Sequence, residues 1–315
     1  MLKSKFFYLS LILACCIACN QSEYKTSESG IQYKFLTNGE GAVPENKEFV
    51  YLNVSFKDAR DSIIFTSNNA PLQKDSALWT SQNGALEEVV NLCKEGDSIE
   101  AKVLADDLYA KTFKTQMPVT VTKGSLITIN LSVDKVLSES EFMAEQKQAR
   151  LDQVADYRKQ NLAANAQIMQ SDGETIDAYL ARNNLSAQTT DTGLRYIIVS
   201  EGNGSKPKAG DVVNVDYTGH VLEGAYFDTS REDDAKMHDL YNPARPGGYI
   251  PLEFQLGTGG VIHGWDEGIA LLSKGAKAQL FVPSPMGYGA QQRSEEIVAN
   301  AILVFDVELV DFVSQ

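Results

Sequence analysis

One sequence pattern occurs twice in this chain, and its repetition restricts the folds that the chain can adopt. The stretches 30–41 (GIQYKFLTNGEG) and 193–204 (GLRYIIVSEGNG) are related, and each is followed three residues later by a proline. A segment of alternating apolar and polar residues comes next in both copies, at 51–56 and at 212–217. Alternation with a period of two is typical of strands with one buried face. The repeat therefore predicts two copies of one β-rich domain.

A different kind of segment separates the two copies. We place the first copy at 23–137 and the second at 191–315, with residues 138–185 as a helical linker. The linker is rich in Ala, Gln, Glu, Lys and Arg, which favour helices, and its apolar residues recur at helical spacing. We expect the helix to be interrupted at Asp172-Gly173. The linker either packs on the domains as a spacer or pairs two chains into a homodimer, and the sequence leaves both open.

Residues 1–19 have the pattern of a lipoprotein signal peptide. Two lysines precede an apolar run over 6–18, which is too short to span a bilayer comfortably, and Cys19 follows it directly. The run and its cysteine resemble the lipobox of bacterial lipoproteins, which implies cleavage before Cys19 and lipidation of its thiol. Cys15 ends a rival box, and an ordinary cleaved signal peptide is the remaining alternative. We therefore expect a lipid-anchored protein of the bacterial cell envelope, at the outer membrane or the periplasmic face.

Composition argues against several classes of partner. The net charge is −14, with 28 Lys and Arg against 42 Asp and Glu, so a nucleic-acid partner is not expected. Three of the four cysteines lie in the leader, which leaves Cys93 alone in the folded part. The three histidines are scattered and have no metal-ligand spacing. We expect no disulfide framework, no metal site and no cofactor.

Six short motifs in the second copy occur in a specific order and spacing. They are VDYTG (215–219), FDTS (227–230), FQLG (254–257), VIHGWDEG (261–268), YG (288–289) and LVFDVEL (303–309). Together they resemble the FKBP family of peptidyl-prolyl cis/trans isomerases across nearly the whole second copy. The resemblance implies an α+β fold with two FKBP-like units, each a curved antiparallel sheet wrapped on a short helix, joined by the helical linker.

The reaction of that family is a rotation about a peptide bond, in which no covalent bond forms or breaks. Rotation about the peptide bond before a proline is opposed by amide resonance, with a barrier of about 18–20 kcal/mol. A catalyst must bind the twisted amide more tightly than the planar one. A dry aromatic cavity that holds the proline ring, with a few fixed polar groups for the rotated carbonyl, is suited to this task.

The resemblance also assigns roles to residues of this chain. Four residues would act on the amide, through side-chain polar groups or a backbone N–H: Tyr217, Asp228, Tyr288 and Ile262. Six others would bind the substrate, with Trp265 as the floor of the cavity: Phe227, Leu252, Val261, Trp265, Ile297 and Phe305. The sequence departs from the family pattern at Leu252, where Phe is common, at Gly260, where Glu is common, and at Val298, which replaces a Pro. These departures put the affinity for the family's macrolide inhibitors in doubt.

The first copy keeps the fold pattern without most of these residues. Thr66 stands in the place of Asp228, and Leu86 in the place of Trp265. We interpret 23–137 as a degenerate, non-catalytic repeat. The whole chain is then an isomerase that assists folding of proline-containing polypeptides. The alternative is a non-catalytic chaperone or structural surface lipoprotein whose isomerase pocket is vestigial.

Overall fold

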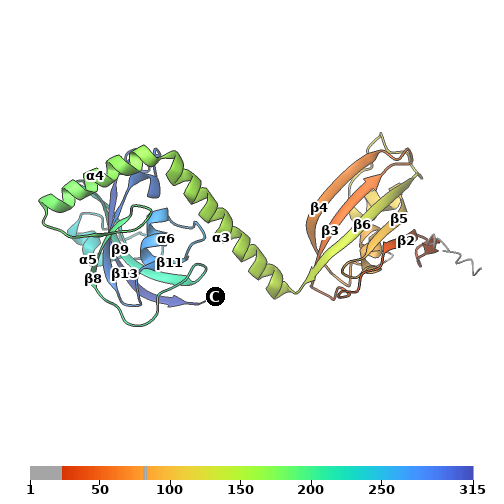
Figure 1. Ribbon diagram of the computed structural model, residues 1–315, viewed down its shortest axis with the longest axis horizontal. Helices are drawn as coiled ribbons and strands as arrows, with labels where there is room; N and C mark the ends of the chain where they lie inside the picture. Colours follow the sequence, from red (N-terminus) through yellow and green to blue (C-terminus); the bar gives the residue numbers. More distant parts are fainter. Residues whose placement is uncertain (1–22, 81, 83, 315) are drawn as a thin grey trace, which may run out of the picture. The chain divides into compact units, whose positions relative to one another are not determined.

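The described part of the chain forms two compact units (Figure 1). The computed structural model describes residues 23–80, 82 and 84–314. Unit 1 extends to Met143 and unit 2 begins at Ala144. The predicted signal peptide and both candidate lipidation cysteines, Cys15 and Cys19, lie outside the described residues. Over the described ranges, no helix combines the length and the apolar character that a membrane crossing needs.

Unit 1 is an antiparallel sheet with short helices at its side. Its strands are β1 (Lys25–Thr26), β2 (Gln32–Thr37), β3 (Phe49–Lys57), β4 (Ile63–Gln73), β5 (Ser98–Leu104) and β6 (Leu126–Leu137), in the order β1-β2-β5-β6-β3-β4. Its helices are α1 (Leu86–Asn91), α2 (Ala105–Asp107) and η1 (Leu108–Thr112). Alternate residues of β3, β5 and β6 are buried, as the period-two pattern predicted.

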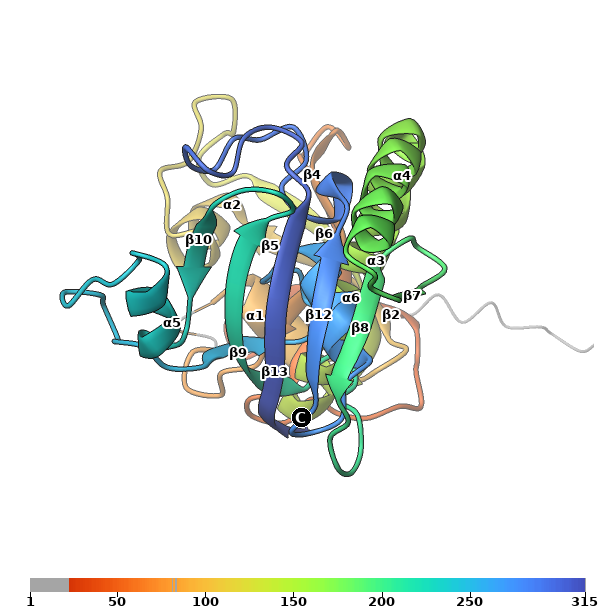
Figure 2. The same ribbon diagram turned by 90° about the vertical axis from the view of Figure 1, so that its left-hand side faces the viewer.

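Unit 2 contains a second antiparallel sheet, whose strands lie side by side in Figure 2. Its strands are β7 (Gln188–Thr189), β8 (Arg195–Ser200), β9 (Val212–Val221), β10 (Tyr226–Thr229), β11 (Leu252–Gln255), β12 (Lys277–Val282) and β13 (Leu303–Val313), and the main order is β10-β9-β13-β12-β8-β7. Its short helices are α5 (Glu232–Met237), α6 (His263–Ala270) and η2 (Ser284–Met286).

The two sheets have the same strand order when β10 and β11 of unit 2 are counted together as one edge strand. They differ at one edge. In unit 1, β4 pairs with β3 from Phe49 to Lys57 without a long interruption. In unit 2 the corresponding edge is split, because β10 and β11 pair with separate halves of β9 and a long insertion containing α5 lies between them. The structure confirms the predicted α+β class.

Helix α6 lies unusually close to the sheet of unit 2. A Cβ atom added at Gly264 would be 2.6 Å from Val282 Cγ1, and one added at Gly268 would be 2.6 Å from Leu280 Cδ1. Both glycines therefore allow a close approach that a larger residue would prevent. The helix covers the main apolar core, and this packing fixes the position of Trp265 in its first turn.

The helical segment belongs to unit 2 over most of its length. It forms α3 (Glu139–Ala164) and α4 (Ala166–Arg182), with Asn165 between them. The predicted interruption at Asp172-Gly173 is wrong, because α4 continues through both residues. Asp172 is buried and accepts a hydrogen bond of 2.7 Å from the Ser284 backbone N–H. A Cβ on Gly173 would be 2.7 Å from the Arg195 guanidinium, so this glycine serves packing rather than a turn.

Helix α4 covers the face of the sheet that is opposite to α6. Ile176 and Leu180 of α4 form a small apolar cluster with Phe281 of β12 and Val304 of β13. Figure 2 shows α4 beside β12 and β8. Unit 2 is thus a sheet enclosed between α6 on one face and α4 on the other, which is a layered arrangement with two apolar cores.

Candidate active site

A cavity of about 770 Å³ opens in unit 2 between the sheet, α6 and α3. The sheet and the loops around α6 contribute a lining that is mainly apolar: Tyr217, Phe227, Asp228, Leu252, Val261, Ile262, His263, Trp265, Tyr288 and Phe305. Cavities of this size that combine an apolar surface with polar groups are typical of sites for small or extended ligands.

Aromatic rings form the deepest part of the cavity. Trp265 is 4% exposed, and its ring lies nearly perpendicular to those of Tyr217 and Phe305, at centroid distances of 5.0 and 5.3 Å. Phe227 contacts Phe305 edge to face at 5.7 Å. Edge-to-face pairs are favourable for aromatic quadrupoles and hold each ring in one orientation. The four rings therefore give a rigid apolar surface that faces one shared space.

Gly219 explains how three strands bring these rings together. It lies in β9 directly opposite Phe305 of β13. A Cβ atom at this position would be 2.7 Å from the Phe227 ring and 2.8 Å from the Phe305 ring. Any other residue at position 219 would push both rings out of place. The Tyr-Thr-Gly motif thus creates space for the aromatic walls in addition to supplying Tyr217.

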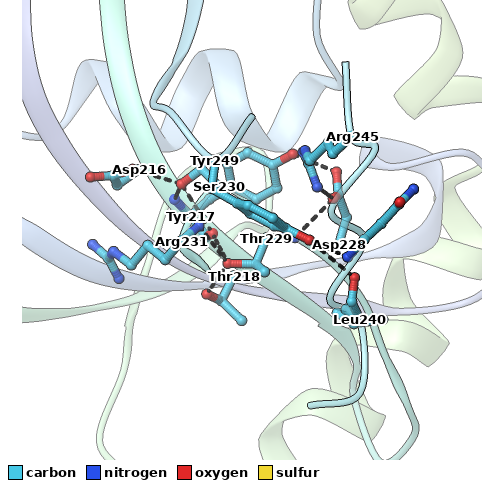
Figure 3. A network of polar contacts seen from close by, with 11 residues as sticks. Asp216, Tyr217, Thr218, Asp228, Thr229, Ser230, Arg231, Leu240, Arg245 and Tyr249 are labelled. Carbon is cyan, nitrogen blue, oxygen red and sulfur yellow. Dashed lines mark hydrogen bonds and ion pairs between the residues drawn. The ribbon is translucent and has the colours of Figure 1, made fainter. Parts of the chain in front are cut away.

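Asp228 is the carboxylate of the cavity, and hydrogen bonds hold its position (Figure 3). It accepts a hydrogen bond from the Tyr217 hydroxyl, one of 2.7 Å from the Arg245 guanidinium and one of 2.9 Å from its neighbour's backbone N–H. Burial and the hydrogen bond to Asp228 raise the pKa of Tyr217 well above its usual value. Tyr217 is therefore a neutral hydroxyl donor at any physiological pH, and Asp228 orients it.

Arg245 comes from the insertion between β10 and β11, and the sequence did not predict its role. Burial opposes its charge, yet the hydrogen bond and ion pair with Asp228 raise the pKa of Arg245. Its guanidinium also lies 5.0 Å from the Tyr249 ring centroid. The insertion is fixed to the sheet by a hydrogen bond of 2.6 Å from Thr218 to Asp234 of α5. The insertion has no periodic pattern in sequence, so only the fold shows this contact.

Ile262 and Tyr288 offer hydrogen-bond donors to a ligand in the cavity. Ile262 precedes α6 in an extended conformation, with φ −60° and ψ 152°. Among the described residues we find no acceptor for the Ile262 backbone N–H or for the Tyr288 hydroxyl. Arg293 lies over the Tyr288 ring at 5.0 Å from its centroid. The two unused donors are suited to bind carbonyl groups of a polypeptide.

All but one of the residues assigned from sequence line this cavity. They are Tyr217, Asp228, Tyr288, Ile262, Phe227, Leu252, Val261, Trp265 and Phe305. Ile297 instead is 7% exposed and packs in the apolar core, and its backbone N–H donates to Ser294 Oγ at 3.0 Å. Ile297 lies in the loop between Tyr288 and β13, so the sequence placed it near the site. The sequence could not show that its side chain points into the core instead of the cavity.

One wall of the cavity comes from α3, which sequence reasoning placed in the linker. Its contributing residues are Arg150, Gln153, Val154, Tyr157, Arg158 and Asn161. Their spacing places them on one helix face. The apolar spacing of Leu151 and Val154 predicted a buried stripe, and both residues pack on the segment before α6. The sequence showed the stripe but could not show what covers it.

In unit 1 the equivalent place is filled by a side chain. Phe56 pairs with Ile129 as Gly219 pairs with Phe305 in unit 2, so Phe56 stands at the position of Gly219. Phe113 packs on Phe56 and Phe65 at 5.7 and 6.3 Å. Tyr109 lies against Phe113 in turn, at 5.2 Å. Across the described ranges of both units, no group of three or more His, Cys, Asp or Glu residues is placed to hold a metal ion.

Comparison with known proteins identifies the family of unit 2. A family model described as FKBP-type peptidyl-prolyl cis-trans isomerase matches residues 203–310. FK506-binding protein 1 of Dictyostelium discoideum is 37% identical over 120 residues, which cover 98% of that protein and 38% of this chain. The chain belongs to the FKBP-type isomerase family. FK506-binding protein 1A of Emericella nidulans is 41% identical over 118 residues, which cover 95% of that protein and 37% of this chain.

A longer bacterial FKBP-type protein is also similar. The protein named probable FKBP-type peptidyl-prolyl cis-trans isomerase FkpA, from Neisseria meningitidis, is 37% identical over 139 residues. That match covers 44% of this chain and 45% of the Neisseria protein, so less than half of either is compared. The FKBP-type family therefore accounts for the cavity-bearing part of unit 2.

Proposed function

We propose that this chain catalyses cis/trans isomerisation of peptidyl-prolyl bonds in polypeptides. One observation carries the proposal: four aromatic rings converge on one cavity beside a fixed Tyr217–Asp228 pair and two unused donors. The rings exclude water from a bound proline ring, which weakens the solvation of the polar planar amide. The donors of Ile262 and Tyr288 hold the flanking carbonyls while the bond rotates, and Tyr217 and Asp228 face the twisted amide.

NMR exchange spectroscopy on a short X-Pro peptide tests this proposal. The uncatalysed exchange takes tens of seconds or longer, so a catalysed rate is easily distinguished. Phe227→Leu, which changes a half-buried wall, should lower kcat/KM. Tyr226→Ala is the matched control, because Tyr226 is its neighbour and stacks on His238 at 3.5 Å, outside the cavity lining. Exchange at the uncatalysed rate with folded wild-type protein would reject the proposal.

We propose further that the cavity binds a macrolide inhibitor. Two relatives of unit 2 are named FK506-binding proteins, and the aromatic lining of unit 2 offers an apolar surface for such a ligand. Leu252 is 40% exposed at the rim, so it provides less contact than the aromatic residue common there in the family. Inhibition of isomerase activity by FK506, with Leu252→Phe binding more tightly than wild type, is the expected result. Equal affinity in both proteins would argue against this role of Leu252.

We propose that the protein works in the bacterial cell envelope, held to a membrane by lipid on Cys19. The apolar run over 6–18 and the cysteine directly after it support this proposal. One acyl chain gives marginal membrane binding, so a stable anchor needs more than one. Labelling with radioactive palmitate should be lost in Cys19→Ala and retained in Cys15→Ala. The opposite pattern would move the lipidation site to Cys15, and labelling of neither protein would reject the anchor.

We propose that unit 1 is a degenerate FKBP-like repeat without isomerase activity. Its strand order matches that of unit 2, while Phe56 stands at the position of Gly219, which unit 2 needs free for its aromatic walls, and Phe113 packs on Phe56. One observation favours holding of unfolded clients as a second function. Large apolar side chains are exposed at one end of the sheet, on β4, β5 and β6: Ile63, Phe65, Leu104 and Leu126.

Suppression of aggregation of a denatured test protein measures this second function separately. Ile63→Ser with Leu126→Ser should weaken the suppression, because apolar exposed surface binds unfolded chains. The same pair of substitutions should leave the isomerase rate on a short peptide unchanged. Unaltered suppression of aggregation in the double variant would reject the holding surface on unit 1.

A further inference from the structure

Helix α3 is fastened to the cavity by contacts along its length. The Arg150 Nε donates a hydrogen bond of 3.1 Å to the Thr258 carbonyl, and the Asn161 side chain donates one of 2.9 Å to the Pro285 carbonyl. Between them Arg158 forms an ion pair with Asp266, whose side chain is only 2% exposed. Asp266 is in α6 directly after Trp265. The cavity wall that α3 provides is therefore fixed to the same helix that carries the floor.

The charges around the cavity are unevenly distributed. The charged residues of the lining, apart from histidine, are Arg150, Arg158, Asp228 and Arg293. Two of them are neutralised locally, Arg158 by Asp266 and Asp228 by Arg245. Arg150 and Arg293 have no carboxylate partner among the described residues, and both are exposed at the rim.

These two guanidinium groups lie on different elements that border one cavity. Arg150 is on α3 beside Thr258, and Arg293 stacks on Tyr288, one of the two residues with an unused donor. Glu295 and Glu296 follow Arg293 in the chain but are not part of the cavity lining. A polypeptide with its proline on Trp265 must leave the cavity past this rim, so its flanking side chains come near these cations.

We propose that α3 completes the substrate site and that Arg150 and Arg293 select polypeptides with an acidic side chain next to the proline. The proposal rests on the isomerase function and names its substrate class. The chain as a whole carries −14 charges and repels acidic peptides at long range. At physiological ionic strength such repulsion is screened beyond about 8 Å, so the local cations dominate for a bound peptide.

Exchange spectroscopy on two peptide series tests the proposal with the full chain. One series places Glu, Gln or Lys before the proline, and the other places the same residues after it. In at least one series kcat/KM should fall in the order Glu, Gln, Lys, with Glu over Lys by about three- to tenfold, since exposed charge pairs contribute modestly. Raising the salt concentration to 0.5 M should reduce the ratio.

Variants then assign the preference to the two arginines. In Arg150→Ala with Arg293→Ala the ratio of Glu to Lys peptides should approach one, and in Arg150→Glu it should fall further. Arg182→Ala is the matched control, because Arg182 is an exposed arginine of unit 2 that pairs with Glu223 away from the cavity. This control should keep the wild-type ratio.

The outcomes separate this inference from the proposed function. Catalysis of all peptides with no order by charge, or an order that survives in the double variant, overturns the inference and leaves the isomerase function intact. Absence of catalysis on every peptide by folded protein overturns the isomerase function and the substrate preference with it.

Discussion

Asp228 shows how a single side chain combines two tasks in this site. It fixes the Tyr217 hydroxyl and Arg245 through hydrogen bonds, and it keeps an exposed carboxylate face, with 41% of the side chain accessible. Under the proposed isomerase function, its charge would act on a bound amide from a set distance. A carboxylate placed this way stabilises partial positive charge and orients a donor, which suits bond rotation better than proton transfer.

Replacement of Asp228 by Asn tests the importance of this charge. The amide keeps the shape of the side chain but weakens two charge-assisted hydrogen bonds, so we expect kcat/KM to fall about tenfold. NMR exchange on a Leu-Pro peptide measures the effect. Glu223→Gln removes an exposed carboxylate outside the cavity lining and should have no effect. An Asp228→Asn protein with wild-type rates would show that the carboxylate is only structural.

Cys93 gives a second prediction at the residue scale. The thiol is buried in unit 1, and burial raises the pKa of Cys93 to about 12, with the charge of Asp97 as a smaller cause. Because the thiolate is the reactive form, iodoacetamide at pH 8 should not modify Cys93 in the folded protein. In urea, where the pKa returns to about 8.5, modification should be complete within minutes. Rapid labelling of the native protein, detected by peptide mass spectrometry, would contradict the burial of this thiol.

Strands and helices could be predicted where apolar residues recur in the sequence at a regular spacing. The alternating strands of both copies and the helix-rich segment after residue 138 follow from the sequence alone, and the resemblance to the FKBP family implied the short helix of each unit. Two features did not follow. Asp172-Gly173 has the composition of a turn but lies inside α4, where Asp172 accepts a hydrogen bond from Ser284 of η2 and Gly173 packs against Arg195 of β8. The cavity wall on α3 depends on tertiary packing, which the helix periodicity alone does not identify.

The bond from Ser284 to Asp172 makes α4 an integral part of unit 2. Asp172→Ala should lower the free energy of unfolding of this unit by about 1–3 kcal/mol, because a buried backbone N–H loses its acceptor. Urea unfolding followed by NMR signals of unit 2 measures this change. Glu174→Ala, at an exposed position of the same helix, is the matched control. Equal stability of the two variants would mean that α4 contributes little at this contact.

At the scale of the whole molecule, the two units share one strand order but differ at the edge of the sheet beside the cavity. In unit 1 the edge strand β4 is continuous, and Phe113 packs over the aromatic residues of β3 and β4. In unit 2 the same edge is split, and the insertion brings Arg245 to Asp228. The repeat in the sequence predicted the shared fold. The sequence alignment of single residues was wrong by one position on β4, because Phe65 pairs with Phe56 as Asp228 pairs with Gly219, so Phe65 and not Thr66 stands in the place of Asp228.

A pair of equivalent substitutions tests whether only unit 2 is catalytic. Phe305 of β13 and Ile129 of β6 occupy the same position in the two sheets, and both are buried. Phe305→Leu removes an aromatic wall, and the loss of its edge-to-face contacts should lower kcat/KM by about three- to tenfold. Ile129→Val should leave kcat/KM unchanged while lowering the stability of unit 1 by about 0.5–1.5 kcal/mol.

Exchange rates on an X-Pro peptide and urea titrations of the same two proteins give both quantities. The urea titrations show how far each substitution destabilises its own unit, so a loss of activity can be separated from a loss of folded protein. A difference in activity that follows the unit therefore reports the location of the site. If Ile129→Val reduced the rate as much as Phe305→Leu, unit 1 would take part in catalysis, and the Phe113 packing would have to open during turnover.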